Sequence, residues 1–379
     1  MNLRIAGMGW VTPLGSGIDN VWNRLLAGEA ATAETISSPL NDRSYLVFRV
    51  PGAALAEAPP HPRLRRSSAI SRFAAVAGLA ALKDAQIKMD SETAARTALI
   101  FAISNGGVVY TKRFYHEVVE AGAQAASPLL FPETVFNAPA SHLAAILGIE
   151  GVSYTLVGDG AVGILALKMA EDLMQNVAID QCLVVGAEEA DWLLCDAYRK
   201  WRLLRSAPPI EPFEEPPHGM ILSEGAGALL LKSEGRASAR PGRSNRPFGG
   251  AVGIEKITAG TNFSRQRDAA KCASIIFAEL CEDEPDVVIA SANGTFIDRA
   301  ERLATARYCA NKPIYALKSA LGESVGASAL WQTICGAQSL STQALPRVLN
   351  FPRKLPLRSA LISTCGLSQQ IAGLRLKLV

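Results

Sequence analysis

The chain has 379 residues, of which 49% are hydrophobic, and this is enough for one large core or two coupled half-domains. Its 38 basic and 35 acidic residues leave a formal charge of +3, too small and too evenly scattered to indicate nucleic-acid binding. The apolar runs fall short of the roughly 18 residues that a membrane-spanning helix needs, and residues 1–15 lack the charged and apolar segments of a signal peptide. These features argue against a nucleic-acid or membrane-spanning protein and favour a cytoplasmic one.

Strand and helix patterns alternate along the first 232 residues. The apolar stretch 3–5, followed by a Gly-rich turn, predicts a short strand. The continuous apolar run 181–185 predicts a strand that is buried on both faces. We expect further strands at 98–103, 153–157 and 226–232, and helices at 21–26, 72–83, 141–147 and 162–176. Such alternation is typical of an α/β protein.

Residues 236–250 interrupt this pattern with Gly, Pro, Ser and Arg, and they are predicted to be a linker. It would join an N-terminal half, 1–235, to a C-terminal half, 251–379. In the second half we expect helices at 269–280, 299–309 and 325–340, and strands at 286–290, 313–316, 360–364 and 371–378. Two α/β halves in one chain suggest an internal structural duplication, although no short sequence repeat accompanies it.

Seven cysteines occur without a C-x-x-C pair, which is typical of reduced thiols in a cytosolic protein. Cys182, Cys309 and Cys335 lie in apolar stretches and are expected in the core.

Five segments match, in order, the landmarks of the β-ketoacyl-carrier-protein synthases, the condensing enzymes of fatty acid and type II polyketide synthesis. They are GMGWVTPLG at 7–15, VVGAEEA at 184–190, EPFEEPPHGMILSEGAGALLLK at 211–232, ALKSALGESVGAS at 316–328 and STCGLSQQ at 363–370. The resemblance spans nearly the whole chain. It implies an α/β protein with the thiolase fold, five-layered αβαβα and built from two duplicated α/β halves, that dimerises through a central strand.

Condensing enzymes need a cysteine thiolate at a helix N-terminus, where the helix dipole lowers the thiol pKa and backbone N–H groups stabilise the thioester oxyanion. They also need two histidines that polarise the malonyl thioester. The resemblance aligns these three positions with Gly160, Asn293 and Glu323. Asn293 can donate a hydrogen bond but cannot shuttle a proton, and an ionised Glu323 would repel the malonyl carboxylate. The nearest cysteines, Cys182 and Cys195, lie more than twenty positions away, so no shift of the alignment restores a thiol.

Two further family positions stand near this degenerate triad. Lys318 is retained, and we expect an ion pair with Glu323 or a neighbouring acid. Leu367 stands where active relatives have a phenylalanine that gates the acyl entrance. The histidines lie outside the motifs and are expected to be surface or structural residues: His61, His116, His142 and His218.

Residues 104–137 correspond to the region that approaches the partner's acyl pocket in dimers of the family. Phe131, Val135 and Phe136 are therefore candidates for the floor of an acyl tunnel. The alternative is that they belong to the ordinary core.

An intact scaffold with a dismantled site resembles a chain length factor, a non-catalytic ketosynthase homologue. Such a subunit forms a heterodimer with an active ketosynthase, shapes its acyl tunnel in type II polyketide or aryl polyene biosynthesis, and meets the acyl carrier protein through that complex. No metal or cofactor is implied. Actinobacterial chain length factors typically have glutamine at the position of Gly160, and this difference favours the aryl polyene type.

Two alternatives stay open. The first is a repurposed enzyme, classed with the 3-oxoacyl-carrier-protein synthases, that acts on carrier-bound acyl thioesters with Glu323 as general base and Lys318 or Asn293 as electrophilic partner. The second is a homodimeric scaffold without an acyl role.

Overall fold

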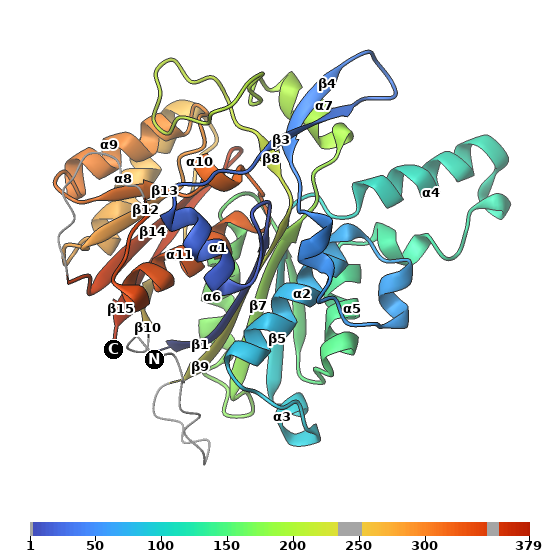
Figure 1. Cartoon of the computed structure of the whole chain (residues 1–379), viewed down its shortest axis with the longest axis horizontal. Coiled ribbons are helices and arrows are strands. Elements are labelled where there is room, and N and C mark those ends of the chain that lie inside the picture. Colours follow the sequence, from blue (N-terminus) through green and yellow to red (C-terminus); the bar gives the residue numbers. More distant parts are fainter. Residues whose placement is uncertain (1–2, 234–251, 347–355) are drawn as a thin grey trace.

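The structure is a computed structural model that describes residues 3–233, 252–346 and 356–379 (Figure 1). The predicted linker, 236–250, lies outside the described residues. Within these ranges, twelve strands form one mixed sheet whose main path runs β13-β12-β14-β15-β10-β1-β9-β7-β5-β6.

The strands on the first side of this path are β1 (Leu3–Thr12), β5 (Thr97–Ile103), β6 (Ser153–Val157), β7 (Gln181–Glu188) and β9 (Gly225–Ser233). Those on the second side are β10 (Val252–Ile257), β12 (Val287–Ala290), β13 (Ile314–Ala316), β14 (Ser359–Cys365) and β15 (Gln370–Leu378). The short strands β2 (Gly15–Ser16) and β11 (Thr261–Asn262) pair with β1 and β15, while β3 (Ala33–Ser37), β4 (Ser44–Phe48) and β8 (Leu222–Ser223) form a small second sheet.

Strand pairing repeats on the two sides of the contact between β1 and β10. From β1 outward the pairs β1–β9 and β9–β7 are antiparallel, and β7–β5 and β5–β6 are parallel. From β10 outward the pairs β10–β15 and β15–β14 are antiparallel, and β14–β12 and β12–β13 are parallel. The same sequence of orientations supports the internal duplication. The two sides meet through an antiparallel β1–β10 pairing of Leu3 with Ile254 and Arg4 with Gly253.

Helices cover both outer faces and fill the space between the two sides (Figure 1). The central pair is α6 (Val162–Leu173) and α11 (Ser328–Thr342), the first outer pair is α2 (Ala69–Asp84) and α5 (Ala138–Leu147), and the second is α8 (Ala269–Leu280) and α9 (Asp298–Tyr308). Nearly all of α11 is buried, because sheet or helix surrounds it on every side. The result is the five-layered αβαβα arrangement expected from the sequence.

The first strand is longer than predicted, and its glycines do not form a turn. A Cβ on Gly7 would lie 2.1 Å from the Ala81 carbonyl oxygen, and one on Gly9 would lie 2.2 Å from that of Ala77. Both glycines therefore let α2 approach the backbone of β1 closely. The predicted Gly-rich turn was wrong, because the glycines serve helix-on-strand packing.

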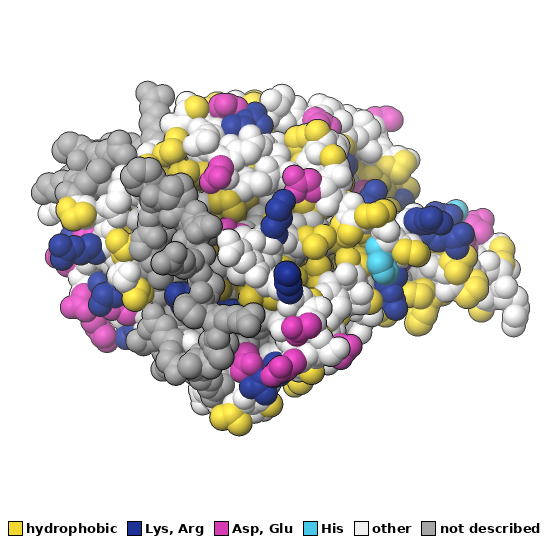
Figure 2. Space-filling view, turned by 60° about the horizontal axis from the view of Figure 1, so that its bottom comes forward, with side chains coloured by type: hydrophobic (Ala, Val, Ile, Leu, Met, Phe, Trp, Pro, Cys, Tyr) yellow, Lys and Arg dark blue, Asp and Glu magenta, His cyan; other side chains and the backbone are white. Residues whose placement is uncertain are grey.

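Four helices were not predicted: α3 (Ser91–Ala95), α4 (Val108–Ala121), α7 (Trp192–Lys200) and α10 (Lys318–Leu321). The most prominent is α4, which projects from the body as an arm (Figure 1) and has no buried residue. Figure 2 shows hydrophobic side chains beside Lys, Arg and His on this arm. This helix has apolar side chains at helical spacing, partly buried Phe114 and Val118 among them, and sequence reasoning overlooked the pattern.

None of the helices in the described ranges is long and apolar enough to cross a membrane.

Candidate functional site: a buried ion pair at the degenerate triad

The polar residues of the site follow the ends of strands and short helices from both halves of the sequence. Ser291 and Asn293 follow β12, Glu323 follows α10, and Cys365 ends β14. Gly160 lies two residues before α6, and a Cβ built on it would lie 3.3 Å from the Cys365 carbonyl oxygen. The fold thus brings the three family positions into one network of contacts.

At the centre of this network, Glu323 is paired with Lys318. The Lys318 Nζ lies 2.7 Å from Glu323 Oε2, so the ion pair predicted from the sequence is confirmed. Asn293 Nδ2 donates to the same oxygen at 2.7 Å. All three side chains are buried, whereas Glu323 Oε1 has no hydrogen-bond partner among the described residues. The two donors of the site are therefore directed at an internal carboxylate.

Ser291 connects this ion pair to the loop beside Gly160. Its hydroxyl oxygen accepts hydrogen bonds from Lys318 Nζ and from the backbone N–H of Cys365, each at 2.9 Å. The loop after β14 is thereby held to the residues that follow β12.

Two acids in the first turn of α9 accept hydrogen bonds from the backbone around Asn293. Asp298 accepts the backbone N–H groups of Asn293 and Gly294, both at 2.9 Å. Glu301 accepts the backbone N–H of Ser291 at 2.7 Å and the hydroxyl of Ser363. Burial raises the pKa of both carboxyl groups, that of Glu301 to about 7. Sequence reasoning missed both acids, although Asp and Glu three residues apart at a predicted helix start were a usable signal.

The side chain of Asp159 links Gly160 to the loop that follows β14. Its Oδ1 accepts the backbone N–H of Gly160 at 2.8 Å. Its Oδ2 accepts the backbone N–H and the hydroxyl of Ser368, at 2.7 and 3.0 Å, and the backbone N–H of Gln369 at 3.3 Å. One carboxylate thus connects the loop 366–369 to the segment just before α6. Sequence reasoning did not use this residue, although an acid replaces the family's alanine at this position.

The predicted tunnel residues lie on the surface of the single chain. Phe131, Val135 and Phe136 are 57%, 39% and 45% exposed, so the alternative that they are ordinary core residues was wrong. The Phe131 ring lies 5.7 Å from that of Phe114 on α4, and Leu367 is partly buried.

The four histidines lie outside the network around Glu323, as expected from the sequence. His142 pairs with Glu133 at 2.5 Å, His218 pairs with Glu214 at 3.0 Å, His61 accepts the backbone N–H of Arg63, and His116 is exposed.

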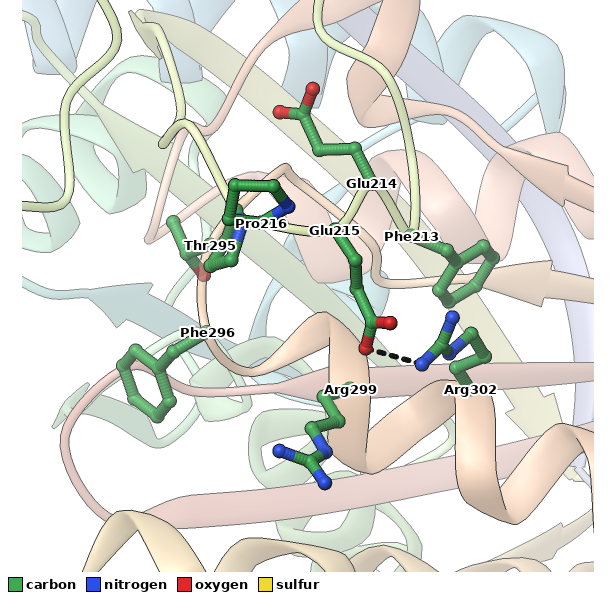
Figure 3. A pocket seen from close by; sticks show the side chains of 9 residues that line it. Phe213, Glu214, Glu215, Pro216, Thr295, Phe296, Arg299 and Arg302 are labelled. Carbon is green, nitrogen blue, oxygen red and sulfur yellow. Dashed lines mark hydrogen bonds and ion pairs between the residues drawn. The ribbon is translucent and has the colours of Figure 1, made fainter.

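A cavity of about 480 Å³ lies beside the site (Figure 3). Thr295 and Phe296, which follow Asn293, form one part of its lining, and Arg299 and Arg302 of α9 form another. Arg302 is paired with Glu215 across it. The Thr295 hydroxyl donates to Asn293 Oδ1 at 2.7 Å, so one wall of the cavity contacts the network directly.

Two further buried acids lie at the C-terminal end of β7. Glu188, at its end, accepts the backbone N–H groups of Ser104 and Asn105 at 3.0 and 3.1 Å. Burial raises the pKa of Glu188 to about 8 and that of Glu189 to about 7. Glu188 is therefore protonated at neutral pH.

This protonation predicts a stability that falls as the pH rises. Between about pH 4.5 and 8 the folded state keeps a proton on Glu188 that the unfolded chain has lost, so the stabilisation is complete below pH 4.5 and is lost as the pH rises through 8. Within this pH range, a carboxyl group that stays protonated in the folded state should lower the free energy of unfolding by about 1.4 kcal/mol per pH unit. Glu188→Gln should reduce the slope measured by urea unfolding at a series of pH values, whereas Glu120→Gln on the exposed face of α4 should not. An unchanged slope in Glu188→Gln would contradict this assignment.

The duplicated halves and the central helix pair are those of the thiolase fold. Residues 2–237 match the family model described as Beta-ketoacyl synthase, N-terminal domain, and the chain therefore belongs to the β-ketoacyl synthase family. Among curated relatives, Nodulation protein E of Rhizobium leguminosarum bv. trifolii is 24% identical over 365 residues, which cover 92% of this chain and 88% of that protein.

Two solved structures are also similar to the chain. The ishigamide ketosynthase/chain length factor matches with a TM-score of 0.84 at 19% identity, covering 100% of this chain and 99% of the other. A ketosynthase in complex with its chain length factor from Xenorhabdus doucetiae matches with a TM-score of 0.76 at 19% identity, covering 100% of this chain and 98% of the other. At these identities the likeness concerns the fold.

Proposed function

We propose that this chain is a non-catalytic subunit of the chain-length-factor type, which pairs with an active ketosynthase and shapes its acyl tunnel in type II polyketide or aryl polyene biosynthesis. The observation that carries the proposal is the buried Lys318–Glu323 pair with Asn293. It stands where the family needs two histidines facing a substrate. The acyl carrier protein would be met through the ketosynthase partner.

Each part of the condensing chemistry is lacking or engaged elsewhere. Gly160 has no nucleophile, and its N–H, which the family would direct at a thioester oxygen, is bound to Asp159. Asn293 and Lys318 donate to Glu323, whose carboxylate opposes the negative charge of a malonyl group and its enolate. A substrate would have to displace internal hydrogen bonds and then find no thiol.

The outer edge of the sheet supports a partner subunit. The edge strand β6 pairs with β5 on one side and with no other strand among the described residues. Tyr154 and Val157 on this strand are 45% and 52% exposed, so the unpaired edge presents apolar side chains to solvent in the single chain. The arm formed by α4 and the exposed Phe131, Val135 and Phe136 add further uncovered apolar surface. The two similar structures pair a ketosynthase with a chain length factor.

Co-expression with a ketosynthase encoded next to this chain tests the proposal. We expect the two chains to co-purify as a stable 1:1 complex. Tyr154→Asp should weaken it by at least about tenfold, because it places a charge on the apolar edge strand. Leu40→Asp, at an exposed apolar residue between β3 and β4, is the matched control and should leave the complex intact. A stable homodimer that ignores the ketosynthase would overturn the heterodimer and favour the homodimeric scaffold.

One observation favours a second candidate, the repurposed enzyme. Glu323 Oε1 is buried without a partner among the described residues, and a free carboxylate oxygen could act as a general base. The cavity lined by Thr295 lies on the other side of Asn293, so an acyl thioester would have to open the Thr295–Asn293 contact to reach this carboxylate. Turnover of acyl-carrier thioesters by the chain alone that is lost in Glu323→Gln would establish this candidate in place of the non-catalytic subunit.

A further inference from the structure

Two cysteine thiols face each other at the ends of neighbouring helices. Cys281 follows α8 and Cys309 follows α9, and each donates its backbone N–H to the last turn of its own helix. Their sulfur atoms lie 3.3 Å apart, and both thiols are free. A third cysteine, Cys272 within α8, donates its thiol to the Asn262 carbonyl oxygen instead.

The surroundings give the two thiols unequal reactivity. Cys281 is partly exposed, and the thiol of Cys309 together with the charges of Arg375 and Lys312 lowers its pKa. Cys309 is buried, and its pKa is raised by its contact with Cys281 and by burial. A peroxide would therefore meet Cys281 first, the more accessible and more acidic of the two thiols, with the Cys309 sulfur 3.3 Å away.

We propose that Cys281 and Cys309 form a dithiol–disulfide couple that is oxidised by hydroperoxides. The Cys281 thiolate attacks a peroxide oxygen, the O–O bond breaks, and the sulfur becomes a sulfenic acid. The Cys309 thiol then attacks that sulfur; the S–S bond forms, the S–O bond breaks, and the hydroxide leaves as water with the proton of Cys309. Two thiols and one hydrogen peroxide thus give one disulfide and two waters, and a small dithiol reduces the disulfide back to two thiols while becoming a disulfide itself.

Formation of the disulfide requires only a short movement of the two sulfur atoms. The sulfur atoms must move from 3.3 Å to about 2.05 Å, and both residues lie at helix ends, where side chains and backbone adjust more easily than within a helix. The helices α8 and α9 already pack in one apolar cluster that includes Cys309.

The disulfide would enclose the C-terminal part of the degenerate site. The loop between Cys281 and Cys309 contains β12, Asn293 and the first turn of α9 with Asp298 and Glu301. Closing this loop restricts the unfolded chain, so oxidation should stabilise the segment that holds Asn293. This inference does not depend on the proposed function.

Intact mass spectrometry of the full chain, treated with hydrogen peroxide and compared with a dithiothreitol-reduced sample, tests the couple. We expect a loss of about 2 Da, a cross-linked peptide pair containing Cys281 and Cys309, and a melting temperature raised by a few degrees. Cys272→Ser, the control within α8, should behave in the same way. Cys281→Ser should show none of these changes.

Cys309→Ser separates the two roles, because it leaves the reactive thiol without its partner. It should gain about 16 Da as a sulfenic acid that dimedone traps at Cys281, again with no rise in melting temperature. Two outcomes would overturn the proposal: both thiols remaining open to alkylation after peroxide treatment, or oxidation of Cys281 to the sulfinic acid in the wild-type chain without a bond to Cys309.

Discussion

Lys318→Met should lower the free energy of unfolding by about 3–5 kcal/mol, because it leaves the Glu323 carboxylate buried without its counter-charge. Both side chains are almost fully buried, and Asn293 would remain as the one donor to Glu323. Urea unfolding at pH 7 measures the effect. The ammonium also holds Ser291, so the loss includes that hydrogen bond.

Two comparisons separate an uncompensated charge from an ordinary loss of packing. Lys168→Met, which removes a partly exposed cation from its pairs with Glu171 and Asp172, should cost less than about 1 kcal/mol. Adding Glu323→Gln to Lys318→Met should recover much of the loss, since the neutral amide needs no counter-charge. If Lys318→Met costs no more than Lys168→Met, the buried pair does not stabilise the fold in the way argued here.

Sequence reasoning found the central pair, because a retained lysine five positions before an acid in a recognisable motif admits few other partners. It did not find Asp159, Asp298 or Glu301, which accept mainly backbone N–H groups. Hydrogen bonds to the backbone leave no complementary charged side chain in the sequence, so the position of Asp298 and Glu301 at a helix start was the usable signal for those two acids. The pair Cys281 and Cys309 was missed because the two helix ends meet only after α8 and α9 pack.

For the fold, most long buried elements were predicted, but β10 was missed although it is mostly buried between β15 and β1. The strand β7 contains the apolar run 182–185 and is buried throughout, as expected. The arm α4 packs no side chain fully into the core, and β3 and β4 belong to a small sheet outside the main one. Short strands that pack through a few edge contacts have weaker sequence patterns than elements buried within the chain.

Gly160→Cys alone should restore no condensation, and its activity should stay at the wild-type background, at least about 10⁴-fold below an active ketosynthase. A Cβ at this position would lie 3.3 Å from the Cys365 carbonyl oxygen, so the variant requires a small shift of the backbone at the end of β14. Intact mass after incubation with an acyl-carrier thioester should show no acyl adduct on the wild-type chain. The new thiol should react slowly, since the N–H of residue 160 remains bound to Asp159.

Releasing that N–H separates acylation from condensation. Adding Asp159→Ala to Gly160→Cys frees the backbone donor and the loop 366–369, so the rate of acyl-adduct formation should rise at least about tenfold over that of Gly160→Cys. Carbon–carbon bond formation should still be absent, because Glu323 would face the malonyl carboxylate and the enolate with a negative charge. Condensation by Gly160→Cys alone would show that Asn293 and Lys318 can serve a substrate despite Glu323. Acylation without condensation would instead place the barrier at the Lys318–Glu323 pair, which keeps the scaffold intact while closing the site to chemistry.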